Sequence, residues 1–136
     1  MLKLSKKVIV TSGKRKTAVA RAVLKEGKGK VKLNGVPLDL HTPYLYQMRL
    51  QEPLILAEDY KNKVDISITV KGGGVMSQAD AARIAVAKAL SEYAPKLKTV
   101  FMGYDRQLLV ADVRLKETSK PNRHGKARAK KQKSYR

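Results

Sequence analysis

The chain has 136 residues, of which 30 are Lys or Arg and 11 are Asp or Glu, and its formal net charge is +19. It has no Cys and only two His residues, which excludes disulfides and argues against a His/Cys zinc site. No apolar run reaches the roughly 18 residues that span a bilayer, and the apolar stretch near the first residue is too short for a signal peptide. We therefore expect a soluble cytoplasmic protein.

The charge is unevenly distributed along the chain. The net charge is +10 over residues 1–35, +1 over residues 36–115 and +8 over residues 116–136. Self-repulsion on this scale opposes a compact state unless a partner supplies negative charge. Nucleic acid is the first candidate for that partner, and an anionic membrane surface is the second.

The last 21 residues differ in composition from the rest. Residues 116–136 hold nine Lys or Arg, one acid (Glu117) and no aliphatic side chain larger than Ala. Such a segment cannot bury enough apolar surface to offset its ordering entropy, so we expect it to be disordered alone and to extend along a polyanion. The prediction is one globular domain over residues 1–115, followed by a basic tail over residues 116–136.

The first forty residues predict mainly strands. In chain order we expect a strand at 8–11, a basic turn at 12–16, a strand at 17–25, a strand at 30–33 and a tight turn at Asn34-Gly35. Periodicity alone leaves helix and strand open for residues 17–25. The glycines on either side favour a strand in a hairpin, with residues 30–33 as its partner.

Helices and two strands are predicted for the rest of the domain. In chain order we expect a helix from Pro43 to about Gln51 capped by Thr42, an interruption at Pro53, a helical piece at 54–60, a strand at 65–71, a helix from Gln78 to Tyr93 capped by Ser77, a short helix from Pro95 to about Met102, and a strand at 107–115. No internal repeat is visible. The order β-β-β-α-β-α-β, with antiparallel hairpins first, predicts an α+β two-layer sandwich.

A cluster of cations in the first hairpin gives the strongest binding signal. It comprises Lys14, Arg15, Lys16 and Arg21, and no acid occurs from residue 1 through residue 25. An ordinary solvated surface mixes charges of both signs, so this segment predicts contact with phosphate. If residues 14–21 formed one strand, Arg15 and Arg21 would share one face and Lys14 and Lys16 the other.

The triglycine Gly72–Gly74 before a predicted helix has two readings. A Walker-type phosphate loop needs Gly-Lys-Ser/Thr leading into the helix, whereas here Gly74 is followed by Val-Met-Ser. The alternative is a strand-to-helix turn at which the backbone approaches a neighbour closely, including a nucleic-acid backbone. The helix amino terminus behind the turn would favour a phosphate there.

The titratable residues give no catalytic arrangement. Glu58 and Asp59 are adjacent, so they point to different sides of a helix, and His41 and His124 have no partner in their own segments. We therefore predict that the protein is not an enzyme. Most Tyr residues are expected to be half-buried packing residues, and Tyr135 in the tail is expected to touch a partner.

Three separated motifs resemble a known family. They are Gly13-Lys-Arg-Lys-Thr-Ala-Val-Ala-Arg21, Lys71-Gly-Gly-Gly-Val-Met-Ser-Gln-Ala79 followed by Arg83, and Gln132-Lys-Ser-Tyr-Arg136. In this order, over about residues 8–136, they resemble the small-subunit ribosomal protein S-nine family. The Ser-Tyr-Arg ending is similar to the archaeal and eukaryotic branch. Many members have Gly where this chain has Ser77, a departure that leaves the helix start intact.

The resemblance implies a fold like the second domain of ribosomal protein S-five. That fold has a mixed sheet with helices on one face and a left-handed crossover, although right-handed crossovers are the strong default. The implied place is the head of the small ribosomal subunit, bound to the 3′ major domain of its RNA beside other head proteins. The tail is implied to run toward the anticodon stem-loop of the P-site transfer RNA. No cofactor or metal is implied.

The site residues follow from the charge pattern and the resemblance together. Ribosomal RNA contact is predicted for Lys14, Arg15, Lys16, Arg21, Gly72, Gly73, Gly74, Arg83, Arg123, Lys126, Arg128, Lys130 and Lys131. Transfer RNA contact is predicted for Lys133, Tyr135 and Arg136. Two other classes of function stay open: a DNA-coating protein that acts through charge alone, and a nucleotide-dependent enzyme with ATP near Gly72–Gly74.

Overall fold

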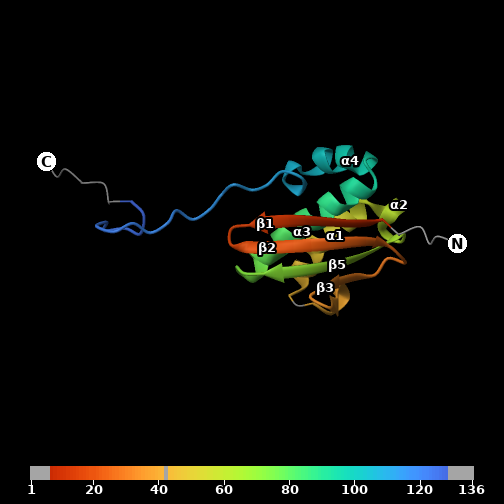
Figure 1. The fold of residues 1–136 in the computed structure, drawn as a ribbon, viewed down its shortest axis with the longest axis horizontal. Coiled ribbons are helices and arrows are strands. Elements are labelled where there is room, and N and C mark those ends of the chain that lie inside the picture. Colours follow the sequence, from red (N-terminus) through yellow and green to blue (C-terminus); the bar gives the residue numbers. More distant parts are fainter. Residues whose placement is uncertain (1–6, 42, 129–136) are drawn as a thin grey trace.

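The computed structural model describes residues 7–41 and 43–128. Its elements in chain order are β1 (Val8–Arg15), β2 (Ala18–Glu26), β3 (Val31–Leu33), β4 (Val36–Pro37), the 3₁₀ turn η1 (Leu38–Leu40), α1 (Tyr44–Leu56), α2 (Glu58–Lys61), β5 (Val64–Lys71), α3 (Val75–Tyr93), α4 (Lys96–Tyr104) and the 3₁₀ turn η2 (Arg106–Leu108). Figure 1 shows the sheet in front, the helices behind it, and the chain after η2 leading away from the domain.

The five strands form one mixed sheet in the order β1-β2-β5-β3-β4. β2 pairs antiparallel with both β1 and β5, and β3 pairs antiparallel with β4. The pair β3–β5 is parallel, so the chain between them crosses over through α1 and α2. The predicted α+β class, a mixed sheet with helices packed on it, is therefore confirmed.

The core lies between the sheet and its helices. Buried and exposed residues alternate with period two along β1, β2 and β5, so each strand turns one set of side chains inward. β2 contributes Ala18, Ala20, Ala22 and Leu24, all with no exposed surface. α3 lies against this side, and its buried residues are mostly Ala.

Small residues let α3 and β1 approach unusually closely. A Cβ placed on Gly13 would lie 2.2 Å from the carbonyl oxygen of Ala81 and 2.8 Å from the backbone nitrogen of Ala85. The hydroxyl of Thr11, the polar residue buried on the same strand, donates to the carbonyl oxygen of Ala85 at 2.7 Å. Gly13 is therefore a packing residue inside β1, and the prediction that it belongs to a turn was wrong.

Two strand predictions were wrong because pairing is decided by distant segments. β2 was expected to pair with residues 30–33, but β1 and β5 occupy both of its edges, and β3 pairs with β5 instead. The first strand also runs on to Arg15, so the turn falls at Lys16 and Thr17, where Lys16 takes a left-handed φ of 54°. The tight turn at Asn34 and Gly35 is confirmed, with φ values of 51° and 83°.

Several helix predictions also need correction. α1 continues through Pro53, whose ring is buried among core residues that offset the lost hydrogen bond. Its N-cap is Pro43, and the predicted cap Thr42 lies outside the described residues. α3 begins at Val75 after Gly74, so Ser77 is not its cap.

The predicted last strand at 107–115 does not form. Within the described part of the chain, η2 covers Arg106–Leu108, and no helix or strand follows it. Its start packs into the core instead, where Leu108 has no exposed surface.

Gly13→Ala is expected to destabilise the domain, because the new methyl group would collide with the backbone of α3. Such overpacking costs about 2 kcal/mol of unfolding free energy, which urea titration followed by circular dichroism would measure. The matched control is Gly103→Ala in α4, where a Cβ meets nothing within 4 Å and stability should rise slightly. Equal stability of the two variants would contradict the close packing of α3 on β1.

Candidate nucleic-acid interface

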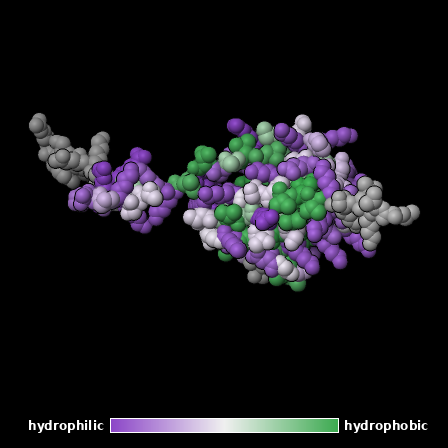
Figure 2. All heavy atoms as spheres, viewed as in Figure 1, coloured by the Kyte–Doolittle hydropathy of each residue, from purple (hydrophilic) through white to green (hydrophobic). Residues whose placement is uncertain are grey.

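The side of the sheet away from the helices carries a cationic surface. We call this surface the open face, defined by the outward residues Val8, Val10, Ser12 and Lys14 of β1, Val19, Arg21, Val23 and Lys25 of β2, Lys32 of β3, and Asp65, Ser67, Thr69 and Lys71 of β5. It therefore carries five cations and one acid. Figure 2 shows an apolar patch over β1 and β2 with hydrophilic residues around it.

The strand register places these cations in neighbouring rows. Lys14 lies opposite Val19, which lies opposite Lys71, so two lysines flank a valine across three strands. In the next row Arg21 lies between Ser12 and Thr69, two hydroxyl side chains. Adjacent strands are about 4.8 Å apart, so these rows bring together cations and hydroxyl groups, which are the side chains that contact phosphate oxygens.

Lys14 and Arg21 share a face of the sheet, whereas the sequence predicted opposite faces. The reason is the turn at Lys16 and Thr17, which separates two strands whose register pairs Lys14 with Val19. The alternation of side chains between the two faces, which holds along one continuous strand, does not continue across such a turn. The turn thus brings two predicted binding residues onto the open face.

The single acid of the open face is occupied by backbone contacts. Asp65 Oδ1 accepts hydrogen bonds from the backbone N–H groups of Lys28 (2.9 Å), Gly29 (3.1 Å) and Lys30 (2.9 Å). These bonds, that of Lys30 first, hold the pKa of Asp65 below its ordinary value. The carboxylate therefore orders the 27–30 loop, and both lysine side chains of that loop are exposed.

The triglycine lies beside the turn of the first hairpin. A Cβ on Gly72 would lie 2.7 Å from the carbonyl oxygen of Thr17, and one on Gly73 would lie 2.9 Å from the Cβ of Ala18. Both residues have positive φ, 75° and 67°. Packing against the hairpin therefore accounts for these two glycines, which favours the strand-to-helix turn over a nucleotide loop. A Cβ on Gly74 meets nothing within 4 Å.

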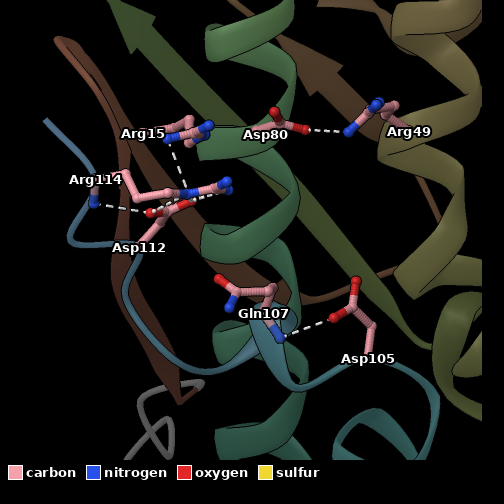
Figure 3. Close-up of polar contacts among 7 residues, drawn as sticks. All are labelled: Arg15, Arg49, Asp80, Asp105, Gln107, Asp112 and Arg114. Carbon is pink, nitrogen blue, oxygen red and sulfur yellow. Dashed lines mark hydrogen bonds and ion pairs between the residues drawn. The ribbon is translucent and has the colours of Figure 1, made fainter. Parts of the chain in front are cut away.

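Arg15 connects β1 to the segment that follows η2. Its Nη1 lies 3.2 Å from Asp112 Oδ2, and the Asp112 side chain is only 8% exposed. Arg114 also holds this carboxylate, through its backbone N–H at 2.9 Å and its guanidinium at 2.8 Å (Figure 3). The hydrogen bonds from the Arg114 side chain hold the pKa of Asp112 well below its ordinary value, and the charge of Arg15 acts in the same direction.

Arg83 is also engaged within the domain. Its Nη2 lies 2.5 Å from Glu52 of α1 and 3.1 Å from Asp105, and its side chain is 12% exposed. One turn away, Arg49 of α1 pairs with Asp80 of α3 at 2.6 Å. These pairs tie α3 to α1 and to the start of η2. The structure thus places two predicted RNA contacts, Arg15 and Arg83, in internal ion pairs.

The described part of the tail is exposed and carries local contacts. Glu117 accepts from Lys120 (3.1 Å) and Arg128 (2.8 Å), and the backbone N–H of Lys120 donates to the carbonyl oxygen of Lys126. The predicted residues Arg123 and Lys126 are exposed. The predicted residues Lys130, Lys131, Lys133, Tyr135 and Arg136 lie outside the described residues.

The remaining polar candidates have structural explanations. His41 Nε2 donates to the carbonyl oxygen of Leu33 at 3.0 Å, and its ring stacks on the ring of Tyr46. Burial raises the pKa of Tyr46 above its ordinary value. Across residues 7–41 and 43–128, no three His, Asp or Glu side chains gather to hold a metal ion. None of the described helices has the length and apolar character to cross a membrane. Tyr44 is 69% exposed, so its predicted packing role was wrong.

Sequence reasoning missed Lys25, Lys32 and Lys71 on the open face, because they lie in three strands far apart in the chain. A usable signal was the alternation along 65–71, which placed Lys71 on the outward side of the most regular strand. The pairing that brings Lys32 beside Ser67 is parallel and crosses two helices. Nothing local in the sequence indicates it.

Comparisons with known proteins agree on one family. The family model described as "Ribosomal protein S9/S16" matches residues 13–136. A protein named "Small ribosomal subunit protein uS9" from Methanococcus maripaludis (strain C7) is 51% identical over 133 residues, covering 96% of this chain and 99% of that protein. The protein of the same name from Methanococcus vannielii is 50% identical over the same coverage.

Acid should release the segment after η2 from β1. Because the pKa of Asp112 is lowered in the folded protein, its contribution to stability is complete above the unfolded-state value of about 3.9 and is lost as the pH falls below it. The backbone amide signal of Arg114 in NMR spectra should shift over that acidic range. In Asp112→Asn the signal should be displaced and independent of pH. A wild-type signal that does not move with acid would contradict the pairing.

Proposed function

Because the chain belongs to the ribosomal protein S9/S16 family, we propose that it is a structural protein of the small ribosomal subunit that binds ribosomal RNA in the head of that subunit. It acts as part of the ribosome in the cytoplasm. It has no enzymatic role. Its partners are the 3′ major domain of the small-subunit RNA, the P-site transfer RNA and neighbouring head proteins.

The charge of the open face is the observation that carries this proposal. Lys14, Arg21, Lys25, Lys32 and Lys71 project from four strands, and the acid among them already accepts three backbone hydrogen bonds. Their charge is therefore available to phosphates. The apolar patch over β1 and β2 offers a surface on which ribose can pack.

The end of the sheet near the hairpin turn extends this surface. Lys16 in the turn, the triglycine and the amino terminus of α3 meet there, since Gly72 and Gly73 pack on Thr17 and Ala18. Backbone N–H groups at a helix start favour a phosphate. We propose that Lys14, Lys16, Arg21 and Gly72–Gly74 contact RNA backbone directly, and that Arg15 and Arg83 act by holding this end of the domain in shape.

The tail is proposed to follow RNA away from the domain. Arg123, Lys126, Arg128, Lys130 and Lys131 would pair with ribosomal RNA phosphates, and Lys133, Tyr135 and Arg136 would reach the P-site transfer RNA. Fully extended, 21 residues span about 70 Å. Arg suits the final contact because its planar guanidinium binds two phosphate oxygens and keeps its charge. The chain leaves the domain on the side of the hairpin turn (Figure 1).

Removing cations from the open face should flatten the salt dependence of RNA binding. For the double variant Lys14→Ala with Arg21→Ala, the slope of log affinity against log salt should become shallower by about 1.5, because each neutralised phosphate contributes about 0.7 to 0.9. The measurement is a filter-binding titration with a fragment of the 3′ major domain RNA.

The control for this titration is Lys96→Ala with Lys98→Ala, which removes two exposed cations from α4, a helix on the other side of the sheet. Its slope should change by less than half as much. Equal slopes for the two double variants would show that binding depends on net charge alone, as in a DNA-coating protein.

Deleting Tyr135 and Arg136 should leave assembly intact and weaken transfer RNA in the P site. The loss of one arginine–phosphate contact is worth about a tenfold change in affinity, the size of a charged hydrogen bond. Transfer RNA binding to purified small subunits would measure it. The control is Arg123→Ala, nearer the domain, which should affect ribosomal RNA contacts only. Normal P-site binding by the truncated subunits would contradict the role given to Arg136.

A further inference from the structure

The segment around the first helix, residues 36–60, carries a local charge opposite to that of the whole chain. Residues 36–60 contain four acids and one base, a net charge of −3 in a chain of +19. The acids are Asp39, Glu52, Glu58 and Asp59, and the base is Arg49. Glu52 is paired with Arg83, and Lys61 and Lys63 follow the segment, so Asp39, Glu58 and Asp59 are the acids that can attract a cationic partner here.

An exposed apolar stripe runs along the same helix. Tyr44, Met48 and Ile55 are spaced i, i+4 and i+11, which places them on one side of α1. They are 69%, 46% and 64% exposed, and Leu45 beside them is 53% exposed. Single exposed apolar residues are ordinary, but several gathered on one side of a surface helix mark a contact site for another protein.

The stripe borders a hollow between α1 and the end of α4. The hollow has a volume of about 610 Å³ and is lined by Leu45, Met48, Arg49, Glu52, Arg83, Tyr104 and Asp105. Tyr104, on the α4 side, is 56% exposed. Three apolar side chains therefore stand around a depression that has room for side chains of a partner.

Both cations of the hollow are already neutralised. Arg83 pairs with Glu52 and Asp105, and Arg49 pairs with Asp80. With two bases and two acids in its lining, the hollow has no net charge. It therefore lacks the free cations that a phosphate needs, in contrast to the open face.

We propose that this hollow and the stripe on α1 form the seat of a neighbouring protein, which presents apolar side chains flanked by Lys or Arg. The apolar side chains fill the space among Leu45, Met48 and Tyr104. The flanking cations face Glu58 and Asp59, two exposed acids just beyond the end of the stripe. This inference rests on the proposed function, since it places RNA and protein on opposite sides of one domain.

A photo-crosslinker tests the seat inside assembled subunits. The photoreactive residue p-benzoylphenylalanine is placed at position 48 in one variant and at position 23, on the open face, in another. The position-48 probe is expected to crosslink to one protein, at a peptide that carries an apolar residue with Lys or Arg nearby. The position-23 probe is expected to crosslink to ribosomal RNA.

Each outcome separates the two proposals. A crosslink from position 48 to RNA, to a peptide without neighbouring cations, or to nothing would overturn the protein seat. A position-23 probe that gives no RNA crosslink would instead overturn the use of the open face, whatever position 48 shows.

A charge substitution gives the second measurement. Met48→Lys should weaken retention of the crosslinked protein by about 30-fold, the cost of losing a central interface residue. Val100→Lys is the matched control, because Val100 is 45% exposed on α4 and does not line the hollow. Quantitative mass spectrometry of subunits carrying each variant reports the loss, and urea unfolding shows that both variants fold. Equal retention of the partner by the two variants would overturn the seat.

Discussion

The close contact between α3 and the first hairpin is the constraint on which the other features of the domain depend. Gly13 and the alanines of β2 and α3 bring helix and sheet so near that a single added methyl group would meet backbone. α3 can fit this way only on the inner side of the sheet, where β1 and β2 present Gly13, Ala18, Ala20 and Ala22. Within residues 7–41 and 43–128 no helix covers the outer side, so its larger side chains are free for a partner. The same packing brings the start of α3 to the hairpin turn.

Two groups of cations in the described part of the chain have different physical roles. Arg15, Arg49 and Arg83 are held by carboxylates at 3.2 Å or less, and they join elements that are distant in sequence. Truncating one member of such a partly buried pair leaves the other charge without compensation. The lysines of the open face are exposed and offer their charge outward. Arginine serves the first group well because its planar guanidinium can hold two carboxylates at once, as Arg83 does.

Much of the domain could be predicted from the sequence, with errors where long-range pairing decides. The strands at 17–25 and 65–71, the helix ending at Tyr93 and the Asn34-Gly35 turn follow from local periodicity and turn chemistry, and the structure has them. The partner of β3 could not be inferred, because its parallel pairing to β5 depends on a crossover through two helices. Residues 107–115 were predicted to form a strand from their apolar content and the turn signals before them, yet no sheet edge receives them, and Asp112 is held by Arg15 and Arg114 instead.

The candidate site shows the same limit. Lys14, Lys16 and Arg21 could be selected from their charge, since exposed cations need no tertiary information. The internal engagement of Arg15 and Arg83 could not, because Asp112, Glu52 and Asp105 are brought to them by the fold. Sequence charge therefore indicates the class of partner, while the fold decides which cations are free to meet it.

The position of β1 as an edge strand of the sheet has a consequence for the protein before it joins any assembly. An edge strand offers unpaired backbone groups to other strands, which favours aggregation. Here Lys88 of α3 donates to the carbonyl oxygen of Ser12 at 3.3 Å, and Arg15 at the end of the strand is engaged by Asp112. In newly made copies the backbone of this edge strand is thus partly engaged, and the high net positive charge makes the copies repel one another. Both effects discourage self-association before the protein binds its partners.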